Sequence, residues 1–145
     1  TSTLFNLKTY VDQNADDGTF IAYCFAEKQG YSKIGSYTGN GNADGTFVYL
    51  GFKPAFVMTK PSNKTGEWFM IDNKRDPSNY VRRRLKANGN AAENTDDNQD
   101  FDILSNGFKA RRNAGDWNSS GDTFIYMAFA ENPFTTSTGV PATAR

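Results

Sequence analysis

Residues 19–27 read TFIAYCFAE, and residues 123–131 read TFIYMAFAE. The two copies begin with the same three residues and end with the same three, and a polar, Asp/Asn/Gly-rich turn precedes each. Self-similarity over such a long step indicates a repeated unit of domain size rather than a solenoid of short repeats. We therefore expect a C-terminal piece of a longer modular protein. Its parts are residues 1–27, a remnant or the last hairpin of a preceding module, packed on the main domain; residues 28–134, one complete β-sandwich module; and residues 135–145, an extended tail.

The composition is that of a β protein. The chain has 145 residues, with 12 Phe, 7 Tyr and 2 Trp, and the segments between its apolar runs are rich in Asn, Asp, Gly, Ser and Thr. Aromatic residues favour strands, and the small polar residues favour turns. A chain of this length can bury a substantial core as one domain. We expect an all-β fold, an antiparallel β-sandwich, with the jelly roll as its more specific form.

The first copy of the repeat has apolar residues on both faces. Within Thr19–Ala26, Phe20 and Ala22 alternate with Ile21 and Tyr23. A strand that is apolar on both faces is typical of the centre of a sheet covered on both sides. We expect such a central strand here, covered by another sheet or another subunit. Cys24, the only cysteine, is expected to be buried as a small hydrophobe, and no disulfide can form within the chain.

Other strand patterns alternate with turn-rich segments. They cover residues 31–37, 46–50, 55–60, 66–72, 101–104 and 108–112. Asn106-Gly107 favours a type I′ hairpin turn between the last two. The glycine-rich residues 38–45 are followed by a strand pattern, without the helix and lysine of a phosphate loop, so we expect a turn. Residues 79–86 fit either a helical turn or an edge strand that carries charge.

Charged residues gather at two places. Arg82–Arg84 is the densest positive patch, and five acidic residues lie within residues 93–102. We expect a solvated edge and a solvated acidic loop, which pairs loosely with the arginines. The alternatives are contact of the arginines with an anionic glycan or a neighbouring subunit, and Ca²⁺ binding by the acidic loop. Because the spacing of an EF-hand is absent, no metal site is predicted.

The residue types exclude the common catalytic arrangements that require histidine. The chain has no histidine, which removes the Ser-His-Asp, Cys-His and HExxH arrangements. Paired carboxylates could hydrolyse glycosides, but the sequence brings no such pair together. Sixteen basic and sixteen acidic residues give no net charge to attract nucleic acid, and no apolar run approaches the ~18 residues of a membrane span. We predict neither an enzyme nor a cofactor, and no nucleic-acid partner or membrane insertion.

Five segments, in order, resemble a family of tailed-phage virion proteins common in marine phages and cyanophages. The matching segments are Phe20–Glu27, Gly30–Gly41, Phe52–Val57, Leu104–Lys109 and Thr123–Phe134. In that family, tandem β modules repeat YIAYCFAE-, SYTGNG-, LSNGFK- and YIYMAFAE-like motifs, and the proteins are labelled tail-fibre or structural proteins. The resemblance implies a virion location and a β module, and it carries no catalytic residue. The departure from the family pattern is at the front, where only the last strands of a preceding module are present.

The function that we expect from this resemblance is host-surface recognition by the C-terminal module of a tail fibre, as a homotrimer among other virion proteins. Shallow loops would bind a cell-surface glycan, because an exposed Trp ring can stack on the apolar face of a sugar. The expected ligand-binding residues are Trp117, Tyr37, Asn40, Asn42, Arg82 and Arg84. For Trp117 the alternative is a residue that covers the end of the core. The alternative function is a capsid decoration or head-fibre protein with a purely structural role in assembly.

Overall fold

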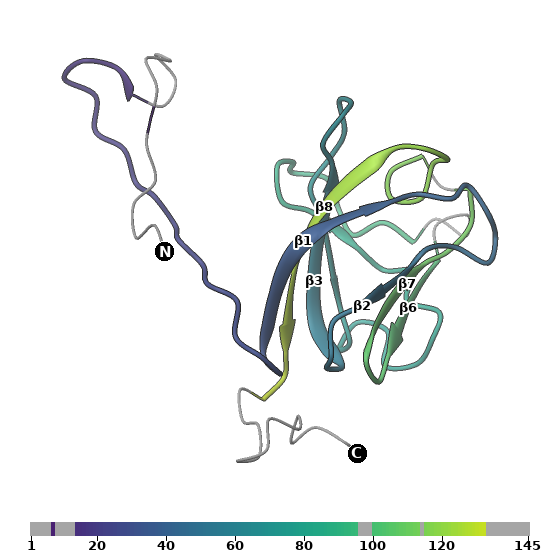
Figure 1. Cartoon of the computed structure of the whole chain (residues 1–145). Coiled ribbons are helices and arrows are strands. Elements are labelled where there is room, and N and C mark those ends of the chain that lie inside the picture. The colour runs from purple at the N-terminus through teal and green to yellow at the C-terminus, as the bar shows by residue number, and fades with distance from the viewer. Residues whose placement is uncertain (1–6, 8–13, 96–99, 114, 133–145) are drawn as a thin grey trace.

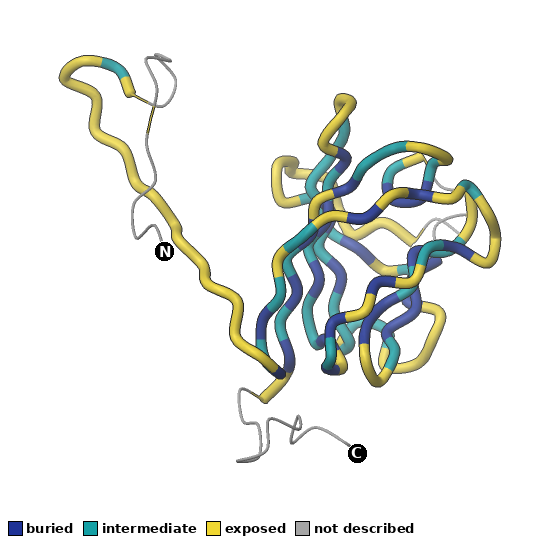
Figure 2. The backbone as a smooth tube through the Cα atoms, in the orientation of Figure 1, coloured by how far each residue is buried: buried dark blue, intermediate teal, exposed yellow. Residues whose placement is uncertain are grey.

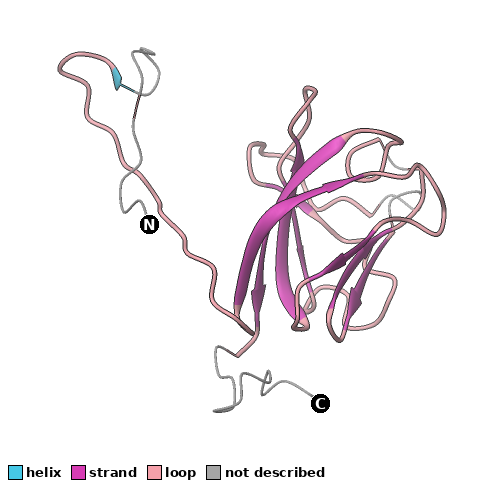
Figure 3. Cartoon of the chain, viewed as in Figure 1, coloured by secondary structure: helices cyan, strands magenta, loops and turns pink. Residues whose placement is uncertain are grey.

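The computed structural model describes residues 7, 14–95, 100–113 and 115–132, and eight strands form within these ranges (Figures 1 and 3). They are β1 (Ser32–Thr38), β2 (Phe47–Tyr49), β3 (Pro54–Pro61), β4 (Phe69–Asp72), β5 (Leu85–Lys86), β6 (Phe101–Leu104), β7 (Gly107–Ala110) and β8 (Thr123–Ala130). One sheet has the order β1-β8-β3-β4-β5 and the other the order β2-β7-β6. All these pairings are antiparallel, so the predicted all-β antiparallel sandwich is confirmed.

The last strand of the described body holds the larger sheet together. β8 lies between β1 and β3 and pairs with each over most of its length. In the opposite sheet, β7 lies between β2 and β6. The first and last strands, β1 and β8, are neighbours in one sheet, as the first and last strands of a jelly roll are. Here the β3–β4 and β6–β7 hairpins keep sequence neighbours in one sheet, so each sheet is completed by a local hairpin.

The core between the sheets is largely aromatic. In β8 the buried Phe124 and Tyr126 alternate with residues that face away from the core. The ring of Phe124 stacks on Tyr37 of β1, with centroids 5.2 Å apart. In the smaller sheet, Phe101 and Phe108 stack at 4.8 Å, and Phe108 meets Tyr126 edge to face at 5.4 Å. Aromatic pairs in these geometries stabilise the core beyond the burial of their area.

The hairpin of β6 and β7 forms as predicted, but its turn differs. Leu104 pairs with Gly107, so Ser105 and Asn106 make the turn, and neither has a positive φ. The predicted type I′ turn is therefore wrong. Gly107 is required for another reason, since a Cβ at this position would lie 2.1 Å from the carbonyl oxygen of Val48 in β2. The absence of a side chain lets two strands approach closely.

The first copy of the repeat does not form the expected strand. Residues 14–27, which we call the arm, run away from the sandwich, and almost all of them are exposed (Figures 1 and 2). Cys24 is exposed, not buried. Within the single chain, the arm is not a strand and does not pack on the main domain beyond its base, where Phe25 touches Phe129 at 5.8 Å; cover by another subunit stays a prediction. The same sequence is a central strand in β8 because β1 and β3 bond it on both edges.

The other local predictions concern the glycine-rich segment, residues 79–86 and the C-terminal tail. Residues 39–45 form a loop, as predicted, with Gly41 at φ 63°, whereas Thr38 is the last residue of β1. Residues 79–86 contain no helix; the edge-strand alternative holds only for β5, Leu85–Lys86, at the edge of its sheet. The predicted tail, residues 135–145, lies outside the described residues, as do residues 96–99 of the acidic loop.

Candidate functional site

Trp117 lies in the core and is not available to stack on a ligand. Its side chain is 1% exposed. Phe69 and Phe101 meet its ring edge to face, at 5.5 and 6.0 Å. The guanidinium of Arg84 lies over the same ring at 5.2 Å. The prediction of a sugar-stacking tryptophan is wrong, and the alternative of a core residue is the one the structure shows.

Tyr37 is also a core residue. Its hydroxyl donates to the carbonyl oxygen of Trp117 at 2.8 Å, which ties β1 to the loop that precedes β8. Burial raises the pKa of the Tyr37 hydroxyl far above its usual range, so the group stays protonated at any physiological pH. Tyr37 therefore cannot contribute to a surface site, contrary to the prediction.

Asn40 and Asn42 hold their own loop in shape. The Asn40 Oδ1 accepts from the backbone N–H of Asn42 at 3.0 Å, and the Asn42 Oδ1 accepts from that of Asp44 at 3.1 Å. Beneath them, Asn118 is fully buried. Its amide donates to Asn40 Oδ1 and to the carbonyl oxygen of Asn42, both at 3.0 Å. Asn118 is thus the centre of the hydrogen-bond network of this loop, and the two exposed asparagines accept its hydrogen bonds.

The arginines and two aspartates of the acidic loop form a cluster of ion pairs. Asp100 is 1% exposed and accepts from Arg82 Nε at 2.9 Å and from Arg112 Nε at 2.6 Å. Asp102 accepts from Arg111 at 3.0 Å. The expectation of a solvated loop is therefore wrong for both aspartates. Their carboxylates bind arginines, and the described residues hold no group of three or more side chains suited to a metal ion.

Arg84 also departs from the expected solvated edge. Its side chain is 2% exposed, and its guanidinium lies over the rings of Phe69 and Trp117 at 5.4 and 5.2 Å. Cation–π contacts with aromatic faces stabilise a charge that has left water. Of the six residues predicted to bind a ligand, Trp117, Tyr37 and Arg84 belong to the core, while Asn40, Asn42 and Arg82 support loops.

An apolar row crosses the outer face of the five-stranded sheet. Residues opposite each other in an antiparallel pair point to the same face. The strand register aligns one residue from each strand in this way: Ile34, Met127, Met58, Met70 and Leu85. Ile34 is 36% exposed and the other four are half-buried. Ile125, Phe56 and Phe129 extend the same face. We call the five aligned residues the apolar row.

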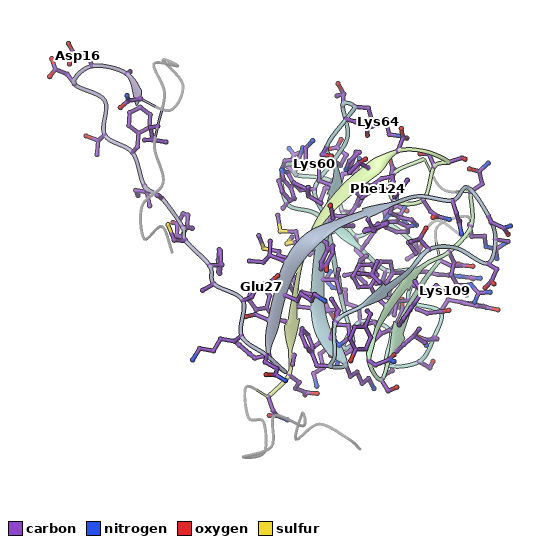
Figure 4. The ribbon with its side chains drawn as sticks, viewed as in Figure 1. Asp16, Glu27, Lys60, Lys64, Lys109 and Phe124 are labelled. Atoms are coloured by element: carbon purple, nitrogen blue, oxygen red, sulfur yellow. The ribbon has the colours of Figure 1, made fainter. Side chains whose placement is uncertain are left out.

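The base of the arm lies against the end of this face. An open hollow of about 450 Å³ lies between the arm and the strand ends, and its lining residues are Cys24, Phe25, Ala26, Lys28, Tyr31, Ser32 and Phe129. Glu27 lies beside β1 where the arm joins the body, whereas Asp16 lies at the far bend of the arm (Figure 4). The described molecule therefore presents two neighbouring apolar features, the arm and the apolar row.

Sequence reasoning missed the importance of Asn118 and of the apolar row. Asn118 stands in a polar stretch that looks like any loop. The row had a signal, because apolar residues occupy both alternating positions of residues 55–60 and 123–130, but the pairing of the strands is needed to align it. Within the described ranges, no helix is long and apolar enough to cross a bilayer.

Comparison with known proteins identifies the family. A family model described as "Domain of unknown function (DUF7483)" matches residues 1–133, which include both copies of the repeated strand sequence. No curated protein and no solved structure matches the chain. The match covers most of the 145 residues. The chain therefore belongs to the DUF7483 family of domains of unknown function.

Proposed function

We propose that the chain is a structural module of a virion, which assembles with copies of itself through the outer face of its five-stranded sheet. The observation that carries this proposal is the apolar row, which continues across all five strands. Single exposed apolar residues are common on protein surfaces, whereas a contiguous apolar patch is typical of an interaction site. Three of the five residues are methionines, whose flexible side chains adapt to a partner surface.

The charge of the chain agrees with self-association. Its sixteen basic and sixteen acidic residues cancel, so copies carry no net charge that would keep them apart. The described charged side chains pair mostly with one another, as Asp100 does with Arg82 and Arg112. An apolar contact between copies would therefore meet little electrostatic opposition.

The virion location rests on the resemblance of the repeated motifs to tailed-phage structural proteins. The structural role is better supported than glycan recognition, because Trp117 and Tyr37, which would stack on a sugar, are buried in the core. An antibody against the chain should label intact phage particles that encode it. Particles that contain no detectable copy of the chain would contradict the virion part of the proposal.

The assembly part is tested by a charge in the middle of the apolar row. Met58→Lys should weaken self-association about tenfold or more, since an unpaired ammonium in an apolar interface costs at least ~1.4 kcal/mol. Phe47→Lys is the matched control, because Phe47 is 46% exposed on the other sheet. Light scattering during size-exclusion chromatography measures the mass of each variant. Equal masses for the Met58→Lys, Phe47→Lys and unmodified chains would count against the apolar row as the interface.

A further inference from the structure

The arm joins β1 through a closed β-hairpin turn. The N–H of Lys28 donates to the carbonyl oxygen of Ser32 at 3.0 Å, and the N–H of Ser32 donates back to that of Lys28 at 2.9 Å. The N–H of Tyr31 also donates to the carbonyl oxygen of Lys28 at 2.9 Å, and Gly30 has φ 73°, the positive φ that a type II turn requires at its third residue. Such a turn normally connects two strands that remain paired. Here the second strand is β1, and the expected first strand is the arm.

The backbone pairing of the arm with β1 stops after Lys28 and Ser32, because side chains bond to the backbone groups of the next pair of residues. In the register of the turn, Ala26 would pair with Ile34. The N–H of Ile34 instead donates to Glu27 Oε1 at 3.0 Å, and the carbonyl oxygen of Ala26 accepts from Ser32 Oγ at 3.0 Å. The arm therefore leaves its own β1 at Glu27, and these two hydrogen bonds oppose closure onto the same chain.

Beyond this point the arm has the properties of a strand that lacks its neighbours. Ile21 and Tyr23 are 79% and 81% exposed on one face, and Phe20 is 47% exposed on the other. Exposure of large apolar side chains to water is unfavourable by roughly 25 cal/mol per Å². The matching residues of β8 are bonded to strands on both edges. No strand among the described residues pairs with the arm, and another sheet would give it a similar environment.

β1 offers a sheet edge for such a strand. It pairs with β8 on one side and lies at the end of the sheet order. The N–H of Ala130 donates to Tyr31, so odd-numbered residues of β1 bond toward β8, and Ser36 directs its N–H and C=O to the open edge. An open edge is a template for strand addition. β1 already pairs over seven residues with β8, whose sequence the arm repeats.

We propose that residues 20–27 of one copy add as a strand to the edge of β1 in a second copy at Ser36, beyond Ser32 and Ile34, whose N–H groups bond to Lys28 and Glu27 of their own chain. This inference rests on the proposed function, because it supplies the backbone pairing for the same self-association. The five-stranded sheet would then continue across the interface, and the apolar faces of the arm would become covered. A second copy is the occupant that fits, since the arm turns away from its own β1 at Glu27, its sequence repeats that of the strand that already pairs with β1, and copies do not repel one another by net charge.

The test removes one hydrogen-bond donor from the open edge. Ser36→Pro deletes the outward N–H of Ser36, which an edge strand tolerates, whereas Ser36→Ala keeps it. The Ser36→Pro chain should associate about tenfold more weakly than the Ser36→Ala chain, because loss of an interfacial hydrogen bond costs ~1.4 kcal/mol. Analytical ultracentrifugation gives the association constants, and a thermal melt followed by circular dichroism shows that both variants fold. Equal association of the two folded variants would overturn the strand-addition proposal.

The single thiol provides a second readout that does not depend on a substitution in β1. Cys24 is exposed in the free arm, so it should react rapidly with Ellman's reagent in dilute protein and at least tenfold more slowly once copies associate. Protection that is independent of protein concentration, in a monomer, would mean that the arm closes on its own chain and would overturn the proposal. Association that persists with a fully reactive Cys24 would also overturn it, while leaving the apolar row and Met58→Lys as the test of the proposed function.

Discussion

Asn118 shows how one buried polar residue can fix a loop that the sequence presents as irregular. Its amide donates to carbonyl oxygens of Asn42 and Arg112, at 3.0 and 2.7 Å. Its Oδ1 accepts from the N–H of Asn40 at 3.2 Å. A buried amide that is satisfied in this way holds groups that would otherwise lack partners. From the sequence, Asn118 could not be told from its neighbours, since its partners Asn40 and Asn42 are distant along the chain.

Asn118→Ala should destabilise the fold strongly. The substitution removes the partner of several part-buried carbonyl and N–H groups of the 39–46 loop, which together costs about 3 kcal/mol in the free energy of unfolding. Asn40→Ala is the matched control, because Asn40 belongs to the same network but is exposed, and it should cost about 1 kcal/mol or less. Urea denaturation followed by tryptophan fluorescence measures both. Equal losses for the two variants would contradict the central position of Asn118.

Trp117 illustrates why the predicted ligand site was wrong. The residues around it, Asp116 and Asn118 among them, are polar, and polar composition is typical of surface loops. The fold nevertheless turns this ring inward, where it contacts Phe69, Phe101 and Arg84. Composition along the chain reports the exposure of a segment on average, whereas the direction of one side chain depends on contacts with distant strands.

At the scale of elements, the repeated sequence adopts two different structures. β8 is a paired central strand, whereas the arm is an unpaired extended segment. Alternation and residue type predicted a strand in both places, because they describe what the side chains require. Alternation and residue type do not say whether neighbouring strands are present to bond and cover the segment. The strands of the body were predicted well for the same reason, since their partners lie within the chain.

The β6–β7 hairpin offers a prediction at this scale. Gly107→Ala should destabilise the protein by about 2 kcal/mol, since the added Cβ would lie 2.1 Å from the backbone oxygen of Val48 and would push β2 away from β7. Gly115→Ala is the control, because nothing lies within 4 Å of its added Cβ. Thermal unfolding by calorimetry measures both variants. If Gly107→Ala melted at the temperature of Gly115→Ala, close approach of the two strands would not explain the glycine.

At the scale of the whole molecule, the sequence predicted the layers but not the surfaces. Fold class followed from alternation and turns, which are local. The apolar row depends on the order β1-β8-β3-β4-β5, which pairs segments far apart in the chain. The predicted ligand site was wrong because it placed on the surface Trp117, from a turn-rich segment, and Tyr37, from the end of a strand, and both are buried. What the assembled sheets expose is an apolar face and an arm, and both point to contacts between copies.

The most direct test of this account is the mass of the unmodified chain in solution as a function of its concentration. Sedimentation velocity from about 1 to 100 μM covers the range in which interfaces of moderate affinity dissociate. The account predicts multiples of 16.1 kDa at the upper concentrations and dissociation on dilution. A single species of 16.1 kDa at every concentration would contradict self-assembly through the outer sheet face and the arm.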